Sequence, residues 1–291
     1  MDRTGLIIKS ISGEYVVLVD SQEYVCKPIG LMRYKNIIPR VGDYCIIDDN
    51  DGKAVIKEIK KRKNELLRPI VANVDKVIIV TSLKKPDLNL NLLDRLICQV
   101  EYSDIPIVLV FSKVDLVNID EYLDIINYYK KIGYKVYITP KEINSLKEEF
   151  ADSICVLAGQ SGVGKSNLIN QLGLGFNLET GEISDALGRG KHTTRHVQLH
   201  KVGSGYLADT PGFGALDLEM DEASLGQTFV EFFKCKCKYN PCFHISEPDC
   251  IVKDEVNKGN ILKSRYDNYL LFLKEIKENK NKRIYKNKEK K

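Results

Sequence analysis

Two kinds of segment are missing from this sequence of 291 residues. Its beginning, MDRTGLIIKSISGEY, lacks the basic-then-apolar pattern of a secretory signal peptide. No apolar run approaches the length that is needed to span a bilayer. These absences argue against secreted and membrane-embedded proteins. Since 43% of the residues are hydrophobic and 29% are charged, we expect a globular cytoplasmic protein with no membrane partner.

A phosphate-binding motif lies near the middle of the chain. Residues 154–158, ICVLA, form a short apolar run of the kind that makes a buried strand. Residues 159–166, GQSGVGKS, match the pattern G-x-x-x-x-G-K-[ST], and Leu168, Ile169 and Leu172 follow at helical spacing. Because strand, loop and helix come in the order that this motif requires, we expect a nucleoside triphosphate site rather than an ordinary glycine-rich turn.

Each part of this motif has a chemical role. The glycines let several backbone N–H groups point at one cluster of phosphate oxygens, and the helix dipole adds to that field. Lys165 is expected to reach the β- and γ-phosphates, and the Ser166 hydroxyl to coordinate Mg²⁺. The nucleotide-binding residues expected here are Gly159, Gln160, Ser161, Gly162, Val163, Gly164, Lys165, Ser166 and Asn167.

The residues that recognise the base are expected upstream. Residues 105–111, IPIVLVF, form another candidate strand, and Ser112, Lys113 and Asp115 follow at its carboxyl end, where ligands bind in open α/β sheets. The Asp115 carboxylate can accept hydrogen bonds from both N1–H and the N2 amino group of guanine, whereas adenine lacks this paired donor edge. A Lys-x-Asp triplet alone is common in solvated turns. Beside a phosphate loop it resembles the N/T-K-x-D element of GTPases, with Ser112 in place of the usual Asn.

Candidate magnesium and switch residues lie downstream of the loop. The sequence from Asp209 to Gly212, DTPG, resembles the D-x-x-G element of GTPases. In that element the Asp holds Mg²⁺ through water and the Gly amide senses the γ-phosphate. Thr193 or Thr194, which lie between the two motifs, can complete the Mg²⁺ shell. The alternative for this segment is a glycine-rich surface loop.

The eight cysteines would indicate disulfides in a small secreted domain. In a chain with a nucleotide site and no export signal, reduced thiols and a metal site are the better interpretation. The stretch CKYNPCFHISEPDC brings Cys237, Cys242, His244 and Cys250 together with the spacing Cys-x4-Cys-x-His-x5-Cys. Three thiolates and one imidazole complete a tetrahedral Zn²⁺ shell with no position left for substrate, so we expect structural zinc. The alternative is a set of scattered buried cysteines.

The order of the nucleotide motifs is unusual. Most GTPases run from the phosphate loop through the threonine switch and D-x-x-G to the base motif, whereas here the base motif comes first. The chain therefore resembles the circularly permuted GTPases of the RsgA family, also called YjeQ, which assist assembly of the bacterial small ribosomal subunit. The resemblance also covers Arg68-Pro69, residues 71–75 (VANVD), residues 91–95 (NLLDR) and the cysteine cluster.

The resemblance implies a protein of three parts. Residues 1–65 would form an all-β OB-fold barrel that binds RNA. Residues 66–220 would form a circularly permuted α/β P-loop GTPase domain with a mainly parallel sheet. Residues 221–291 would form a mainly helical zinc-binding module with a basic tail. The patterns agree, because turn signals such as Ser12-Gly13 separate short strands in the first part, and strands alternate with helices in the second.

The resemblance further implies a GTPase that binds the small (30S) ribosomal subunit and its rRNA. It would assist late maturation and hydrolyse GTP to GDP and phosphate with stimulation by the subunit, as a monomer with Mg²⁺ and one Zn²⁺. Residues 66–222 carry 16 basic and 21 acidic side chains, whereas residues 274–291 carry nine basic and three acidic ones. A phosphate-rich partner would therefore meet the flanking parts. Six basic and aromatic residues of the barrel are candidates for RNA binding, and the alternative is that they form an ordinary solvated surface. They are Tyr24, Lys27, Arg33, Tyr34, Lys35 and Arg40.

The catalytic group is left open. Phe213 follows Gly212 at the position where Ras-like GTPases carry the glutamine that orients the attacking water. An apolar side chain cannot do this, so we expect slow hydrolysis until an activator supplies the missing group. His192 and His196 can position water or serve the structure, and no catalytic residue is assigned. Two other classes stay open: a P-loop ATPase or kinase with a zinc-stabilised nucleic-acid-binding module, and a non-catalytic RNA chaperone that keeps a nucleotide only for stability.

Overall fold

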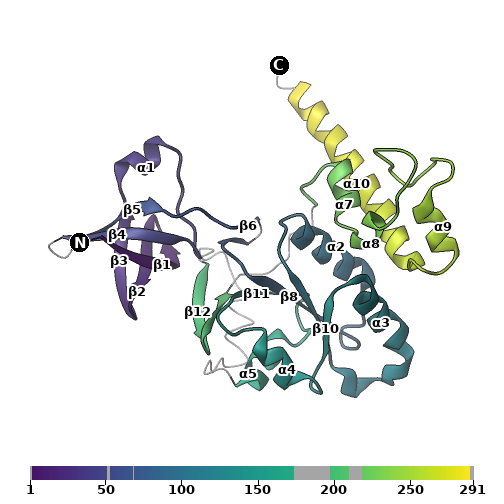
Figure 1. The fold of residues 1–291 in the computed structure, drawn as a ribbon, viewed down its shortest axis with the longest axis horizontal. Helices are drawn as coiled ribbons and strands as arrows, with labels where there is room; N and C mark the ends of the chain where they lie inside the picture. The colour runs from purple at the N-terminus through teal and green to yellow at the C-terminus, as the bar shows by residue number, and fades with distance from the viewer. Residues whose placement is uncertain (1, 51–52, 68, 174–196, 210–217, 289–291) are drawn as a thin grey trace.

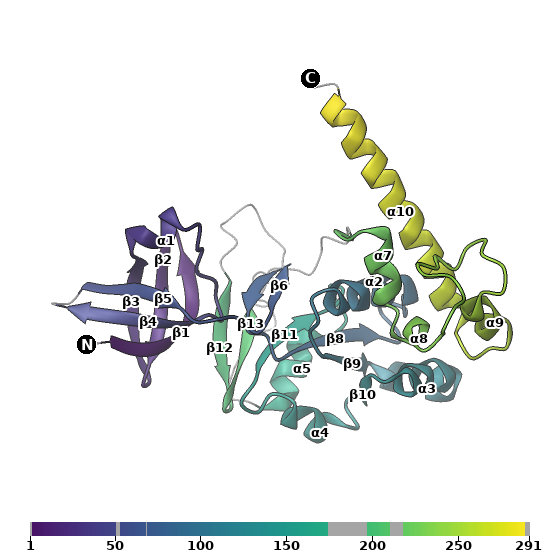
Figure 2. The ribbon, with the colours of Figure 1, turned by 45° about the horizontal axis from the view of Figure 1, so that its top comes forward.

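The computed structural model describes residues 2–50, 53–67, 69–173, 197–209 and 218–288. An N-terminal β-barrel, a central α/β domain and a C-terminal helical module follow one another along the molecule (Figure 1). The barrel and the helical module lie on opposite sides of the central domain, and the second view agrees (Figure 2). The expected succession of barrel, P-loop domain and helical module is confirmed.

The N-terminal barrel closes on itself. Its elements are β1 (Asp2–Ile11), β2 (Glu14–Val19), β3 (Gln22–Pro28), α1 (Gly30–Tyr34), β4 (Tyr44–Asn50) and β5 (Lys53–Ile59). The strands pair in the closed order β1-β2-β3-β5-β4-β1, in which β3 and β5 are parallel and the other pairs are antiparallel. Alternate side chains, among them Ile7, Val17 and Ile47, are fully buried in the interior. This small closed barrel is the OB-fold arrangement that the resemblance implied.

The central domain is built on a mainly parallel sheet. Its strands are β8 (Lys76–Ser82), β9 (Ile107–Ser112), β10 (Lys135–Ile138), β11 (Ile154–Ala158), β12 (Gln198–Val202) and β13 (Gly205–Asp209). They lie in the order β10-β9-β8-β11-β13-β12, and neighbours are parallel except for the antiparallel pair β12 and β13. The runs 105–111 and 154–158, predicted as buried strands, are confirmed as β9 and β11.

Helices cover both faces of this sheet because its strands are apolar on both sides. The helical elements are α2 (Leu90–Glu101), η1 (Val114–Leu116), η2 (Ile119–Tyr122), α3 (Leu123–Ile132), α4 (Ile143–Glu148) and α5 (Lys165–Leu172). α2 and α3 pack on the face that carries Ile79 and Phe111, and α4 and α5 pack on the face that carries Val80 and Val110. The carboxyl ends of β8, β9 and β11 therefore meet at one edge, between these helices.

Buried polar contacts fix the barrel to the chain that leads into the central domain, around the small hairpin of β6 (Glu65–Leu67) and β7 (Ile70–Ala72). Asp43 is fully buried and accepts two hydrogen bonds from Arg62, at 2.7 and 2.8 Å. Asn73 is buried with φ of 56°, and its amide donates to the carbonyl oxygen of Gly42 at 2.8 Å. The segment around Asn73, noted above only as part of a resemblance, therefore joins the two domains.

The C-terminal module is helical and has its own core. Its helices are α7 (Glu222–Gln227), α8 (Val230–Phe233), α9 (Ile251–Asn257) and α10 (Lys263–Lys288). Phe229, Phe232, Tyr269 and Phe272 pack together at its centre. α10 continues beyond this core and projects from the molecule (Figure 2), so the basic tail is helical as far as Lys288. None of the described helices is both long and apolar enough to cross a membrane.

Candidate functional site

The phosphate loop lies between β11 and α5, at the carboxyl edge of the parallel sheet. Gly159, Gly162 and Gly164 have φ values of 140°, 83° and 99°, in the region that favours glycine. A Cβ atom at Gly159 would lie 2.2 Å from the carbonyl oxygen of Val80. The shape of the loop therefore depends on the glycines that the motif predicted.

Lys165 begins α5 and turns its ammonium group back into the loop. Its Nζ donates to the carbonyl oxygens of Gly159 at 2.8 Å and Gln160 at 2.9 Å. Burial lowers the pKa of Lys165 to about 8. A phosphate that replaces these neutral acceptors would stabilise the charged ammonium, so this position favours an anionic ligand.

Ser112 and Lys113 hold the phosphate loop from the neighbouring part of the sheet. Ser112 ends β9, is 6% exposed, and donates its hydroxyl to the carbonyl oxygen of Val163 at 2.6 Å. Lys113 has φ of 58°, and its Nζ donates to the carbonyl oxygen of Gly162 at 2.7 Å and to that of Lys85. Serine thus supplies a brace for the loop at the position where this GTPase element usually has Asn.

Asp115 lies in η1, immediately beyond these two braces, with an exposed side chain. A Cβ atom at Gly164 would lie 3.9 Å from Cε of Lys113, which shows how closely the base motif approaches the phosphate loop. Only β8 separates β9 from β11 in the sheet. The fold therefore brings 112–115 and 159–167 to one edge of the sheet from distant parts of the sequence.

The expected magnesium and switch residues are covered only in part. Thr193, Thr194 and Gly212 lie outside the described residues. Asp209 ends β13, and the parallel pairing of β13 with β11 brings this strand end to the edge where the phosphate loop begins. Ser166 is half-buried in the first turn of α5. His192, His196 and Phe213 also lie outside the described residues.

The four predicted zinc ligands converge in the C-terminal module. The ligand atoms of Cys237, Cys242, His244 and Cys250 all lie within 4.8 Å of one another. Sγ of Cys250 lies 4.0 Å from Sγ of Cys237, 3.9 Å from Sγ of Cys242 and 3.3 Å from Nδ1 of His244. A tetrahedral Zn²⁺ ion with bonds of about 2.3 Å to sulfur keeps its sulfur ligands about 3.8 Å apart. The residues present therefore fit one zinc ion.

The chain around this quartet is held by further hydrogen bonds. The Glu247 carboxylate accepts from the backbone N–H groups of Phe243 and Ile245, each at 2.8 Å. From α10, the hydroxyl of Tyr269 donates to the carbonyl oxygen of Phe243 at 2.9 Å. The His244 ring packs edge-on against the ring of Phe232, with centroids 5.2 Å apart. These contacts orient the ligand loop from outside the metal shell.

The thiols of the quartet need a cation before they can ionise together. Burial raises the pKa of Cys242 to about 12, and the neighbouring thiols of Cys250 and Cys237 contribute to the rise. Cys235 is set apart from the quartet, because its Sγ instead donates to the backbone carbonyl of Glu231 at 3.7 Å. A divalent metal would stabilise the three thiolates that it binds.

The comparison with protein families decides between the open classes. A family model described as RsgA GTPase matches residues 57–219, and one described as RsgA N-terminal domain matches residues 4–56. The chain belongs to the RsgA GTPase family. The expected class of enzyme, a GTP hydrolase, is thereby confirmed. The ATPase, the kinase and the non-catalytic chaperone have no support from this match.

Relatives and solved structures agree over nearly the whole chain. The small ribosomal subunit biogenesis GTPase RsgA 2 of Oceanobacillus iheyensis is 47% identical over 95% of this chain and 98% of its own. The small ribosomal subunit biogenesis GTPase RsgA of Bacillus subtilis is 42% identical, over 95% and 98%. The structure of YloQ, a circularly permuted GTPase, matches with a TM-score of 0.80 at 35% identity over 96% of each chain. That of YjeQ from Thermotoga maritima has a TM-score of 0.81 at 32% identity, over 95% and 99%.

One wall of the nucleotide site was not predicted. Residues 83–89 connect β8 to α2 and lie against the phosphate loop, since Lys113 binds carbonyl oxygens on both. Within this turn, the hydroxyl of Ser82 donates to the carbonyl oxygen of Pro86 at 2.6 Å. The available signal was positional, because this segment follows the carboxyl end of a parallel strand, where ligands bind.

Proposed function

We propose that this chain is a GTPase of small ribosomal subunit biogenesis, which binds the subunit, assists its late maturation and hydrolyses GTP to GDP and phosphate. Membership of the RsgA GTPase family and the names of its relatives support this. The observation that carries it is the pair of braces from Ser112 and Lys113 to the phosphate loop. Through them, the guanine-recognition residue Asp115 is fixed to the loop that binds the phosphates.

In this proposal GTP lies along the carboxyl edge of the sheet. Residues 159–167 bind its phosphates, and Asp115 accepts hydrogen bonds from the guanine N1–H and N2 amino groups. Ser166, Asp209 and Thr193 or Thr194 would hold Mg²⁺, and the Gly212 amide would sense the γ-phosphate. Mg²⁺ held there would help to neutralise the charge that develops on the phosphates.

The flanking parts supply the ribosome-binding surface. Tyr34 at the end of α1 is 86% exposed and stands next to Arg33 and Lys35, a combination that can stack on an RNA base and neutralise phosphates. At the other end, one Zn²⁺ bound by the Cys237 quartet holds the C-terminal module in shape. We infer that the protein works in the cytoplasm as a monomer that contacts rRNA through both parts.

Hydrolysis by the free enzyme is slow in this account. Phe213 occupies the position of the water-orienting glutamine, and its apolar ring offers no hydrogen bond to water. The small subunit then acts as the activator, and groups supplied in trans accelerate GTPases by about 10³–10⁵-fold. GTP hydrolysis on the subunit would therefore time release of the protein.

Sedimentation with purified ribosomal subunits tests this function. The full-length, zinc-loaded protein is mixed with small or large subunits and with no nucleotide, GDP or a non-hydrolysable GTP analogue. We expect co-sedimentation with the small subunit alone, strongest with the GTP analogue. Tyr34→Ala should weaken binding, whereas Tyr44→Ala, which removes a second exposed barrel tyrosine, is the matched control. Equal binding to both subunits, or binding that ignores the nucleotide, would contradict the proposal.

A further inference from the structure

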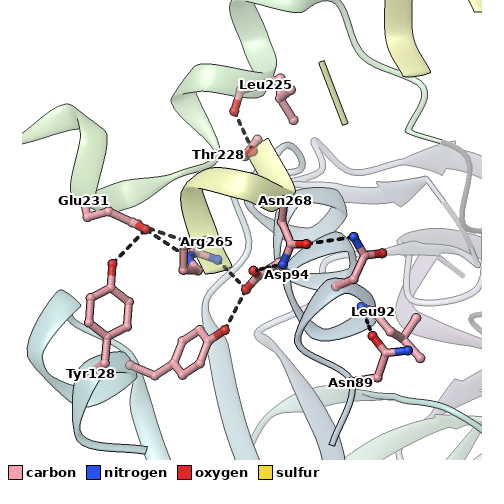
Figure 3. Close-up of polar contacts among 11 residues, drawn as sticks. Asn89, Leu92, Asp94, Tyr128, Leu225, Thr228, Glu231, Arg265 and Asn268 are labelled. Atoms are coloured by element: carbon pink, nitrogen blue, oxygen red, sulfur yellow. Dashed lines mark hydrogen bonds and ion pairs between the residues drawn. The ribbon is translucent and has the colours of Figure 1, made fainter. Parts of the chain in front are cut away.

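Three of the buried charged residues where α2 meets the C-terminal module form a connected group outside both sites (Figure 3). Arg265 of α10 and Asp94 of α2 are fully buried, and Glu231 of α8 is 5% exposed. Arg265 donates from Nη1 to Asp94 at 2.8 Å, and from Nε and Nη2 to Glu231 at 2.8 and 2.9 Å. Burial disfavours the charged form of Glu231, but the Arg265 charge and the hydrogen bonds that the carboxylate accepts together outweigh burial and lower its pKa.

The two ion pairs of Arg265 connect different parts of the molecule. The pair between Arg265 and Glu231 lies within the C-terminal module, whereas the pair between Arg265 and Asp94 crosses to the central domain. Asn268 of α10 adds two hydrogen bonds between α10 and α2. Its amide donates to Asp94 at 2.7 Å, and its carbonyl oxygen accepts from Asn91 at 2.8 Å. The module is thus attached to α2 by buried polar groups that lose their partners if it moves.

The start of the same helix lies against the nucleotide site. Residues 83–89 lead directly into α2, and Lys113 ties this segment to the phosphate loop through the carbonyl oxygens of Lys85 and Gly162. The first turns of α2 also share a small cavity with the phosphate loop. The residues that line it from the two sides include Asn89, Leu92, Leu93, Leu96, Gln160 and Val163. Asp94 follows Leu93 directly, so the cavity wall and the buried carboxylate of Asp94 belong to one helix.

We propose that α2 couples the nucleotide site to the C-terminal module, with Asp94 and Arg265 as the latch between them. A nucleotide that shifts the phosphate loop or residues 83–89 moves the start of α2, and the latch passes this movement to α10. A buried charge tolerates the loss of its partner poorly, so the module follows α2 rather than sliding over it. This coupling is reciprocal. If the nucleotide changes the affinity of the module for a partner by some factor, the partner changes the affinity for the nucleotide by the same factor. This goes beyond the proposed hydrolysis, since it needs only that nucleotide binds.

Hydrogen–deuterium exchange of the full-length, zinc-loaded protein tests the coupling. Exchange is followed with no nucleotide, with GDP and with a non-hydrolysable GTP analogue. We expect the analogue to change the exchange of amides in α2 and in the α2-facing part of α10, residues 263–276. Couplings of this kind are typically about 5–150-fold, so a change of about five-fold or more is expected in α10.

Asp94→Asn isolates the latch. This change removes the charge on α2, yet it leaves Arg265 paired with Glu231 inside the module. The response of the phosphate loop to the analogue should persist. The response of α10 should fall to less than half of the wild-type response, although Arg95 of α2 still pairs with Glu275 of α10 at 2.7 and 2.9 Å. Glu255→Gln, which removes a surface ion pair with Lys258 in the same module, is the matched control and should respond like the wild type.

Each outcome decides the matter. If the analogue binds but α10 of the wild type ignores it, or if Asp94→Asn transmits the full response, the coupling is wrong and the GTP site stands. If the analogue does not bind at all, the proposed function fails as well. Should Asp94→Asn lose its zinc, Asn268→Ala takes its place, because it weakens the crossing while all three charges stay paired. An undiminished α10 response in that variant would also refute the latch.

Discussion

The phosphate loop and the expected zinc centre of Cys237, Cys242, His244 and Cys250 differ in how their conformations are fixed. The phosphate loop is shaped by its backbone: glycines permit its positive φ angles, and Ser112, Lys113 and Lys165 satisfy its carbonyl oxygens. All of these contacts form within the protein. The loop is therefore preorganised for a ligand on which its own folding does not depend.

The zinc centre is instead shaped by side chains that need their ion. Its four ligands come from one stretch of chain, and the thiol pKa of Cys242 is raised to about 12 by burial and by the neighbouring thiols. Few residues of this stretch lie in helices or strands, although Glu247 and Tyr269 hold part of it. Loss of the ligand should therefore leave the phosphate loop folded and should unfold the C-terminal module.

The largest effect is expected at the zinc centre. Cys242→Ser should release zinc and unfold the C-terminal module, because structural zinc contributes about 10–16 kcal/mol in small peptides, more than a small module holds in net stability. Metal analysis and circular dichroism measure this, and a GTP-binding assay should show that the central domain still works. Cys235→Ser, outside the quartet, should keep its zinc. Folded wild-type protein purified without stoichiometric zinc would contradict the claim that the C-terminal module needs its ion to fold.

The next effect concerns catalysis without unfolding. Lys165→Ala removes the only ammonium group placed by α5 in the phosphate loop, so turnover should fall by at least about 10²–10³-fold. The melting temperature should stay close to that of the wild type, since the glycines and the two braces remain. Steady-state GTP hydrolysis measures the turnover, and calorimetry measures the melting temperature. Undiminished turnover would remove this loop from the mechanism.

Asp115→Asn should change specificity rather than the fold. Loss of charge-assisted hydrogen bonds to guanine, worth about 1.5–3 kcal/mol, should weaken GTP by roughly 10- to 150-fold. The new amide can donate to the O2 of xanthine, so xanthosine triphosphate should bind better than GTP. Competition binding with both nucleotides and with ATP measures this. If GTP stayed preferred at unchanged affinity, the assignment of the base site would be wrong.

The smallest effect should come from a brace. Ser112→Ala leaves the buried carbonyl oxygen of Val163 without its donor, which costs about 1–3 kcal/mol. We expect GTP affinity to fall by about five- to ten-fold while the zinc content stays constant. The control is Ser153→Ala. This change removes the hydrogen bond that the Ser153 hydroxyl donates to the carbonyl oxygen of Ala151, outside both the base motif and the phosphate loop. Equal effects of the two changes would show that the loop does not depend on this brace.

Features that depend on one short stretch of sequence could be predicted. The strand, loop and helix of the phosphate motif, the hairpin at Ser12-Gly13 and the convergence of Cys237, Cys242, His244 and Cys250 each follow from a local pattern, and all of them form as expected. The mainly helical character of residues 221–291 was also expected, but the sequence did not indicate that one helix, α10, runs from Lys263 through the basic tail to Lys288. Charge alone does not tell whether a lysine-rich segment stays helical.

Contacts between distant segments could not be predicted. The partner of Ser112 is 51 residues away in Val163, and Asp94 meets Arg265 across 171 residues. In the sequence, residues 91–95 (NLLDR) show only a resemblance to the family. Their role in attaching α10 depends on where Asn91, Asp94 and Arg95 lie in space. A local pattern marks such residues as helical, but it does not say which buried charge will neutralise which.

Stimulation by the small subunit is tested by multiple-turnover GTP hydrolysis, measured with the protein alone, with small subunits and with large subunits. We expect slow hydrolysis by the free protein and an increase of about 10³-fold or more with small subunits, in the range that trans-acting activators reach. Large subunits should leave the rate unchanged, and Lys165→Ala should stay inactive under all conditions. A rate that the small subunit does not raise, or that both subunits raise equally, would contradict this expectation.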